Sequence, residues 1–147
     1  MEIKFNISKS FSETSISINS SHKNDNLILA AKAIDKIINQ EILIGYQNEK
    51  RTVIPLYQII SIHTDNKNII CETQYNTYRL NKRIYEMKEL LPSALFLQLS
   101  NSEIVNISQI KEFNLTKSGN YQVNLLNGTV TYTSRRYAQL IRRELLK

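Results

Sequence analysis

Hydrophobic and polar residues alternate over the first twenty positions of the chain and then change to a helical spacing. Residues 2–8 and 13–19 place isoleucine or phenylalanine at alternate positions, a pattern that predicts two half-buried strands. Residues 24–40 carry apolar side chains three or four positions apart, which predicts an amphipathic helix. We therefore expect a strand–strand–helix extension over residues 1–41, a unit too small to bury a core without a neighbour.

Short runs rich in β-branched and aromatic residues follow, separated by polar turns, and such runs are typical of antiparallel strands. They cover residues 41–47, 51–58, 59–64, 68–74, 77–81, 94–100, 103–110, 112–126 and 129–134. The run 112–126 bends at Ser118-Gly119. Asn127-Gly128 gives the strongest hairpin signal in the chain, and we expect a type I′ turn there, with positive φ at both residues.

Helical spacing returns twice within this strand-rich part. One apolar stripe predicts a helix over residues 80–91, which Pro92 ends. A second stripe predicts the last helix, over residues 135–146. The side chains that this helix should bury are Tyr137, Leu140, Ile141 and Leu145. The expected fold class is therefore mainly β with α (α+β), with short antiparallel strands in small sheets, one inserted helix and a C-terminal helix.

Length and composition fit a single domain with a small appendage, because 147 residues of which 41% are hydrophobic can bury a core. No apolar run approaches the roughly 20 residues that a membrane helix needs, and the N-terminus does not resemble a signal peptide. Cys71 is the only cysteine, so no internal disulfide can form, and we expect it to be a half-buried strand residue. These features predict a cytoplasmic protein.

Neither catalysis nor metal binding is favoured by the sequence. His22 and His63 are the only histidines, and no nucleophile motif or glycine-rich phosphate loop accompanies them. One cysteine and two distant histidines do not make a metal site of standard spacing. We therefore expect no enzyme activity, no cofactor and no metal.

The net charge of +6 is concentrated in the second half of the chain. Residues 71–147 hold 11 lysines and arginines against 6 acidic residues. A basic surface fits a polyanion such as nucleic acid or an anionic membrane, and charge alone does not choose between them.

Two arginines stand where the last helix should begin. Ser134 fits the N-cap, and Arg135 and Arg136 follow near the positive end of the helix dipole. Cations there are unfavourable by about 0.3–1 kcal/mol unless a bound anion offsets them. Free N–H groups at a helix start favour phosphate, and arginine can bond guanine through two N–H groups, so this segment predicts a DNA contact. Arginines that simply extend into water are the alternative interpretation.

Two polar turns offer further groups that can bond nucleic acid. Asn66 and Lys67 lie between two expected strands, and Ser100, Asn101 and Ser102 interrupt two others. Turns use such residues in any case, but their side chains also bond bases and phosphates.

Three segments together resemble the LytTR-type DNA-binding domain of bacterial response regulators. "FLQLSNSEIVNISQI", residues 96–110, is similar to a family segment in which a strand ends in a short loop and resumes as a "VN" strand. "TYTSRRYAQLIRREL", residues 131–145, is similar to the closing strand-to-helix signature, and residues 58–72 resemble the earlier paired strands. The resemblance implies that residues 42–147 form a LytTR-type domain whose loops enter the DNA.

The resemblance also allows the family's DNA contacts to be carried over to this chain. It implies base contacts by Lys67 with Asn66, by Asn101 with Ser100, and by Arg136. It implies phosphate contacts by Arg135 and Ser102. The Ser100-Asn101 pair departs from the basic residue or histidine that many relatives have there, which bears on base preference.

A receiver domain of roughly 120 residues does not fit before residue 42. The chain is therefore similar to the stand-alone LytTR type, which is often paired with a small inhibitory membrane protein. We expect a sequence-specific transcription regulator that binds double-stranded DNA as a homodimer on repeated half-sites. The alternative is a protein-interaction module whose basic last helix, through Arg142 and Arg143, docks an acidic partner or a membrane surface.

Overall fold

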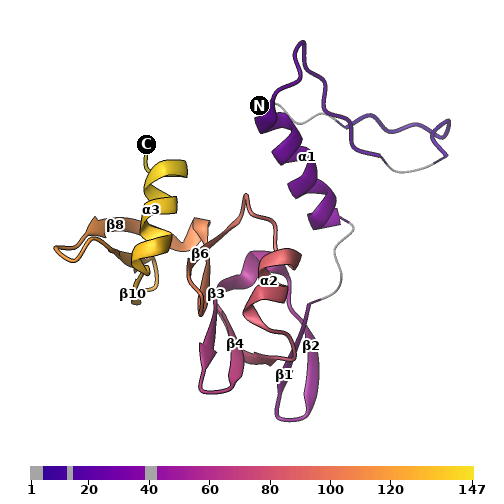
Figure 1. The fold of residues 1–147 in the computed structure, drawn as a ribbon. Coiled ribbons are helices and arrows are strands. Elements are labelled where there is room, and N and C mark those ends of the chain that lie inside the picture. The colour runs from indigo at the N-terminus through magenta and orange to yellow at the C-terminus, as the bar shows by residue number, and fades with distance from the viewer. Residues whose placement is uncertain (1–4, 13–14, 39–42) are drawn as a thin grey trace.

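Ten short strands and three α-helices make up the described part of the computed structural model, which comprises residues 5–12, 15–38 and 43–147 (Figure 1). The helices are α1 (Asp25–Ile38), α2 (Ile84–Leu90) and α3 (Arg135–Glu144). The strands are β1 (Ile44–Gln47), β2 (Lys50–Val53), β3 (Ile59–Asp65), β4 (Asn68–Thr73), β5 (Thr77–Leu80), β6 (Phe96–Ser100), β7 (Glu103–Asn106), β8 (Ile110–Leu115), β9 (Tyr121–Leu125) and β10 (Val130–Tyr132). None of these helices is long and apolar enough to cross a membrane.

The strands pair in antiparallel fashion and form two sheets. The larger sheet has seven strands in the order β2-β1-β5-β4-β3-β7-β6, and the smaller has three in the order β10-β9-β8. Most neighbours in the sheets are also neighbours in the chain, because short polar turns join β-branched runs into hairpins. With α2 inserted after β5 and α3 at the C-terminal end, this arrangement confirms the predicted α+β class of short antiparallel strands.

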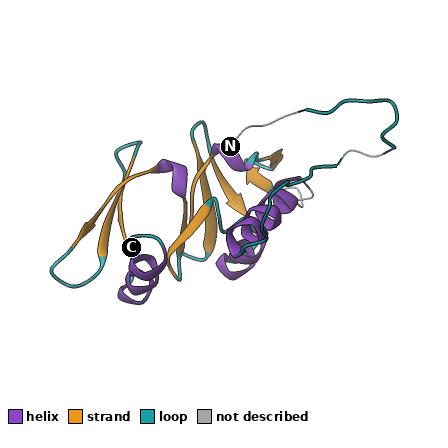
Figure 2. Cartoon of the chain, turned by 90° about the horizontal axis from the view of Figure 1, so that it is seen from above, coloured by secondary structure: helices purple, strands orange, loops and turns teal. Residues whose placement is uncertain are grey.

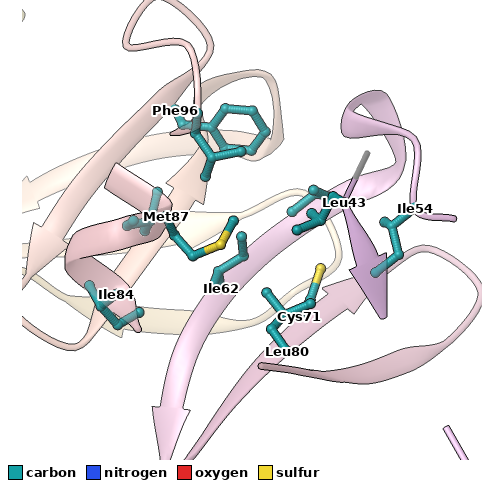
Figure 3. Close-up of a cluster of buried hydrophobic side chains, with 11 residues drawn as sticks. Leu43, Ile54, Ile62, Cys71, Leu80, Ile84, Met87 and Phe96 are labelled. Carbon is teal, nitrogen blue, oxygen red and sulfur yellow. The ribbon is translucent and has the colours of Figure 1, made fainter. Parts of the chain in front are cut away.

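Two clusters of buried apolar side chains lie on opposite faces of the seven-stranded sheet. On one face, α2 places Ile84 and Met87 over Ile62 (Figure 3). On the other, Leu99 and Val105 pack against the three-stranded sheet and α3. The central strands are therefore buried on both faces, which explains why their apolar residues form short runs instead of alternating.

The last helix lies beside β6 and completes the second cluster with Ala138 and Ile141. Tyr137 and Leu140 are half-buried. Leu145 is 44% exposed, so the prediction that it is buried was wrong. The physical reason is that α3 ends at Glu144 and Leu145 is its C-cap, beyond the turn that faces the core.

The predicted N-terminal strands are not formed by the residues that the structure describes. Residues 5–8 and 15–19 are not paired with any strand, and Phe5 and Ile7 are 87% and 91% exposed. The other positions of these two predictions, residues 2–4 and 13–14, lie outside the described ranges. In Figure 1 the described residues 5–12 and 15–24 run as loops away from both sheets, so no strand edge of the described residues accepts their hydrogen bonds (Figure 2 gives a second view). The helix predicted within residues 24–40 is confirmed as α1.

The hairpin at Asn127-Gly128 is confirmed, but its predicted type I′ turn was wrong. Gly128 has φ 87° and Asn127 does not have positive φ. The Leu125 amide donates to the Thr129 carbonyl at 2.9 Å, so three residues form the loop and glycine alone takes the left-handed conformation. A two-residue turn with positive φ at both positions occurs instead in the β1–β2 hairpin, at Asn48 and Glu49.

The inserted helix begins at Ile84, four residues later than predicted, because residues 77–80 pair with β4 as β5. Leu80 still packs under α2, which is why it fitted the helical stripe. The Leu91 amide closes the helix on the Met87 carbonyl at 2.9 Å, directly before Pro92.

Cys71 lies in β4 and is fully buried, so the expectation of half burial was wrong. Its strand is central, with β3 on one side and β5 on the other, and its side chain belongs to the buried cluster under α2. Burial raises the pKa of the Cys71 thiol to about 12, and the neighbouring Glu72 charge adds to the effect. The thiol therefore stays protonated and unreactive.

Candidate nucleic-acid interface

The first candidate segment is the turn between β3 and β4. Asp65 pairs with Asn68, which leaves Asn66 and Lys67 as a two-residue turn. Asn66 has φ 54°, a left-handed conformation that asparagine tolerates better than most residues. Both turn residues are exposed, so the Lys67 ammonium extends into solvent from the end of a rigid hairpin.

The second candidate segment is the turn between β6 and β7. Ser100 pairs with Glu103, and Asn101 and Ser102 form the exposed turn. The Ser102 amide donates to the Ser100 hydroxyl oxygen at 3.2 Å, and the two hydroxyl groups lie 3.1 Å apart. These local bonds fix the turn and present the Asn101 side chain at its outermost position.

The third candidate segment is the start of α3. The Ser134 hydroxyl oxygen accepts the Tyr137 amide at 3.3 Å, which confirms Ser134 as the N-cap. Arg135 and Arg136 are exposed in a first turn that contains no acidic residue. The local electrostatics thus favour an anion here, as the sequence suggested.

Hydrogen bonds between the strands bring these three tips together, namely residues 65–68, 100–102 and 134–136. The Thr64 amide donates to the Ser102 carbonyl at 2.9 Å, and the Ser134 amide donates to the Leu99 carbonyl at 2.9 Å. The Tyr137 hydroxyl lies 3.4 Å from the Asn101 amide oxygen. The β6–β7 turn is therefore the central tip, with the β3–β4 hairpin on one side and the start of α3 on the other.

An open groove of about 950 Å³ lies next to the three tips, and Lys67, Asn101 and Tyr137 all line it. Arg135 and Arg136 belong to the same helix start but are not among the residues that line the groove. The structure therefore brings Lys67 and Asn101 to one groove, and it places the two arginines at the adjacent helix terminus.

Four basic residues that line this groove were not predicted as site residues from the sequence. They are Arg79, Lys82, Arg83 and Lys88. They come from the end of β5, the following loop and α2, and none of the residues that line the groove is acidic. The available signal was the concentration of cations in "RLNKRIYEMK", residues 79–88, most of which fell within the helix predicted over residues 80–91.

Glu103 lies just behind the central tip, at the first position of β7. Its carboxylate accepts a hydrogen bond from the Thr131 hydroxyl of β10, and so links the two sheets. Burial is the largest influence on the pKa of Glu103, and it raises this pKa. The hydrogen bond from Thr131 and the charge of His63 lower it, and the charge of Glu72 raises it. The Glu103 carboxyl therefore holds its proton more readily than an exposed glutamate does, and it is engaged by Thr131.

The basic end of α3, which carried the alternative function, is engaged with its own protein. Arg142 donates from Nε to the Tyr121 hydroxyl at 3.2 Å and stacks over that ring, 5.8 Å from its centroid. Arg143 pairs with Glu144 at 3.3 Å. These contacts hold Arg142 against the protein surface and pair Arg143 with an acid, whereas the first turn of α3 contains no acidic residue.

Comparisons with known proteins agree with this picture. A family model described as the LytTr DNA-binding domain matches residues 49–146. An uncharacterized HTH-type transcriptional regulator of Staphylococcus aureus strain NCTC 8325 is 30% identical over 145 residues, covering 99% of this chain and 98% of that protein. A similarly named regulator of the bovine strain RF122 is 29% identical over the same shares.

A solved structure shows the same fold. It is the LytTr DNA-binding domain of a protein described as a methyl-accepting/DNA response regulator from Bacillus cereus, with a TM-score of 0.67 at 19% identity. The match covers 71% of this chain and 95% of that chain.

The Staphylococcus relatives carry a helix-turn-helix name, and the topology of this chain differs from that motif. In the described ranges, five strands separate α1 from α2, and five more separate α2 from α3. No two of the described α-helices are consecutive, so none of them forms the helix pair of a helix-turn-helix motif.

Proposed function

The chain belongs to the LytTr DNA-binding domain family and is a DNA-binding transcription regulator; on that premise, we propose that its three tips, rather than a recognition helix, read duplex DNA. Each tip presents exposed polar or cationic groups that can bond bases or phosphates. Each ends a rigid element, so little conformational freedom is lost when it binds.

Each tip supplies a different kind of contact. Arg136 can donate two N–H bonds to guanine, and Asn101 can bond adenine with its amide, supported by Ser100. Lys67 donates to guanine acceptors from the β3–β4 turn, where Asn66 sets its direction. Arg135 and Ser102 bind phosphates and fix the register of the protein on the duplex.

The observation that carries this proposal is the hydrogen bonding that joins the tips. Thr64 bonds Ser102, and Ser134 bonds Leu99, both through the backbone at 2.9 Å. Backbone hydrogen bonds do not depend on side-chain rotamers, so we expect the spacing of the tips to be the same in the free protein as on DNA. Contacts that are distant in sequence can therefore act as a single reading surface.

Substitution of Arg136 by alanine tests this assignment. We expect Arg136→Ala to weaken binding to a duplex selected by the purified protein by about 1–3 kcal/mol and to relax the preference at one base position. Fluorescence anisotropy against the selected duplex and its single-base variants measures both effects. Arg143→Ala, an exposed arginine on the same helix, is the matched control and should change neither. A loss below a few tenths of a kcal/mol for Arg136→Ala contradicts the assigned role.

We further propose that the protein acts in the cytoplasm as a homodimer on repeated half-sites, and that residues 1–41 are a separate unit that joins the two copies. The exposed apolar side chains of Phe5, Ile7 and Ile16 support an interaction surface in this segment. Docking of a small inhibitory membrane protein on the same surface is the second candidate. Sedimentation of the purified protein, with and without Ile7→Asp, separates them, because only the homodimer forms without a second component.

A further inference from the structure

We propose that the β5–α2 side of the groove, formed by Arg79, Lys82, Arg83 and Lys88, is a second DNA contact that holds the sugar–phosphate backbone next to the bases read by the tips. This inference rests on the proposed function and adds to it a site that does not read sequence. Its role is to supply affinity, while the tips supply base preference.

Strand register makes this basic side continuous with the first tip. Ile69 of β4 pairs with Leu80 of β5, in antiparallel orientation. The residues that precede Ile69 therefore run alongside those that follow Leu80, so Lys82 lies next to the β3–β4 turn that carries Lys67. A cationic track thus begins at a tip and continues along the neighbouring loop onto α2.

The lining of this track is cationic, with no acidic residue in it. Five cations line the groove with Lys67 included, and no carboxylate of the described residues forms an ion pair with any of them. Glu86, three residues after Arg83, accepts a hydrogen bond from the Arg83 backbone amide at 2.7 Å at the start of α2. With five cations and no acidic residue in its lining, the groove presents an excess of positive charge.

The shape and polarity of the groove favour an extended polyanion over a small ligand. The groove is open along its length, and Asn68, Asn81 and Asn101 add uncharged donors between the cations. Long flexible lysine and arginine side chains bind phosphates wherever these lie, without reading bases. Since Lys67 and Asn101 belong both to the tips and to this groove, a duplex held by the tips lies against the track.

The experiment compares two variants that lose the same charge. The first is Lys82→Gln/Arg83→Gln/Lys88→Gln, which keeps much of the side-chain length and removes three groove cations. The control is Lys50→Gln/Lys111→Gln/Lys117→Gln, three exposed lysines that do not line the groove. Binding of the full chain to its selected duplex and to a random duplex is measured from about 50 to 200 mM salt, the range in which phosphate contacts change affinity most.

We expect the groove variant to bind both duplexes at least about tenfold more weakly at 150 mM salt, by the same factor for each. The slope of log K against log salt should fall by about 0.9 for each phosphate that the variant no longer neutralises, and the ratio of specific to random affinity should stay unchanged. The control should keep the wild-type slope, and circular dichroism should give the same melting curve for all three proteins.

An unchanged slope in the folded groove variant overturns the inference, as does a slope that falls equally in the control. Poly-glutamate serves as a model of an acidic protein. If the groove variant loses binding to poly-glutamate but keeps its binding to duplex DNA, the inference is also overturned, because the groove would then bind an acidic protein. The proposed function fails separately: it is contradicted if wild type prefers no duplex sequence, or if Asn101→Ala leaves the preference intact. An Asn101→Ala effect together with an unchanged groove slope rejects this inference alone.

Discussion

The tripeptide Ile-Ser-Ile occurs twice in the chain, once in the sheet and once in the N-terminal segment, with opposite outcomes. At residues 60–62 it lies in β3, where the two isoleucines are 6% and 0% exposed. At residues 16–18 it forms no strand, and the isoleucines are 62% and 44% exposed. β3 has β4 on one side and β7 on the other, whereas residues 16–18 have no neighbouring strand. An alternating pattern thus specifies a strand only where a partner edge accepts its hydrogen bonds.

The largest expected effect comes from the same substitution made in both copies of this tripeptide. Ile62→Ala should lower the free energy of unfolding by about 2–5 kcal/mol, because it leaves a cavity under α2. Ile18→Ala should change it by less than about 0.5 kcal/mol, because that side chain is 44% exposed and belongs to neither buried cluster. Urea unfolding followed by circular dichroism gives both values. Equal losses at the two positions would contradict the contrast between the regions.

A smaller effect tests how tightly the strand-rich part is packed. A methyl group on Gly45 would lie 2.5 Å from Ile54 Cδ1 and 2.6 Å from Tyr78 Cβ, so Gly45→Ala should cost about 1–3 kcal/mol of stability. Gly119→Ala is the comparison for backbone strain without a clash, since nothing lies within 4 Å of its position and its cost comes from its φ of 85° alone. The same unfolding curves measure both. If Gly45→Ala is as stable as wild type, the sheet is looser at β1 than the structure shows.

The smallest effect concerns the buried acid behind the tips. Because burial raises the pKa of Glu103, the folded protein binds its proton more readily than the unfolded chain. The stability that the protonated Glu103 carboxyl contributes is therefore complete below the pKa that this group has in the unfolded chain. It is lost as the pH rises through the higher pKa that the group has in the folded protein. Glu103→Gln keeps an acceptor for Thr131 and removes this loss, so the variant should be more stable near pH 7. The gain should stay under about 0.5 kcal/mol, because the group is partly exposed and screened. Melting temperatures from pH 4 to 8 test this, and a less stable variant at pH 7 would reject it.

Much of the strand-rich part follows from local sequence, because its hairpins depend on neighbouring residues. Asn66, for example, lies in the polar turn that was expected between two β-branched runs, and it adopts a left-handed conformation there. The turn at Asn127 shows the limit: dipeptide preference favoured type I′, but the register of β9 with β10 requires a three-residue loop. The register of two strands is set by packing of the whole sheet, and it cannot be predicted from two turn residues alone.

The candidate site was predictable as separate tips but not as a surface. The cap at Ser134 and the polar turn at Asn101 are local signals, and the structure places both as expected. The basic groove depends on the pairing of β4 with β5, which sets Lys82 beside the turn at Lys67. Sequence spacing alone does not show which cations become neighbours.

The most direct test of the central claim, that three tips read one stretch of duplex, is cleavage of DNA from a tethered iron chelate. Lys67→Cys, Asn101→Cys and Arg135→Cys each provide one attachment point, because Cys71 is fully buried and, with a pKa of about 12, does not react. Lys50→Cys, in β2, is the control. At protein concentrations that saturate the selected duplex, cleavage from all three tips should fall within about 10 base pairs of one half-site, with none from the control. Cleavage from a single tip, or equal cleavage from the control, would contradict the account.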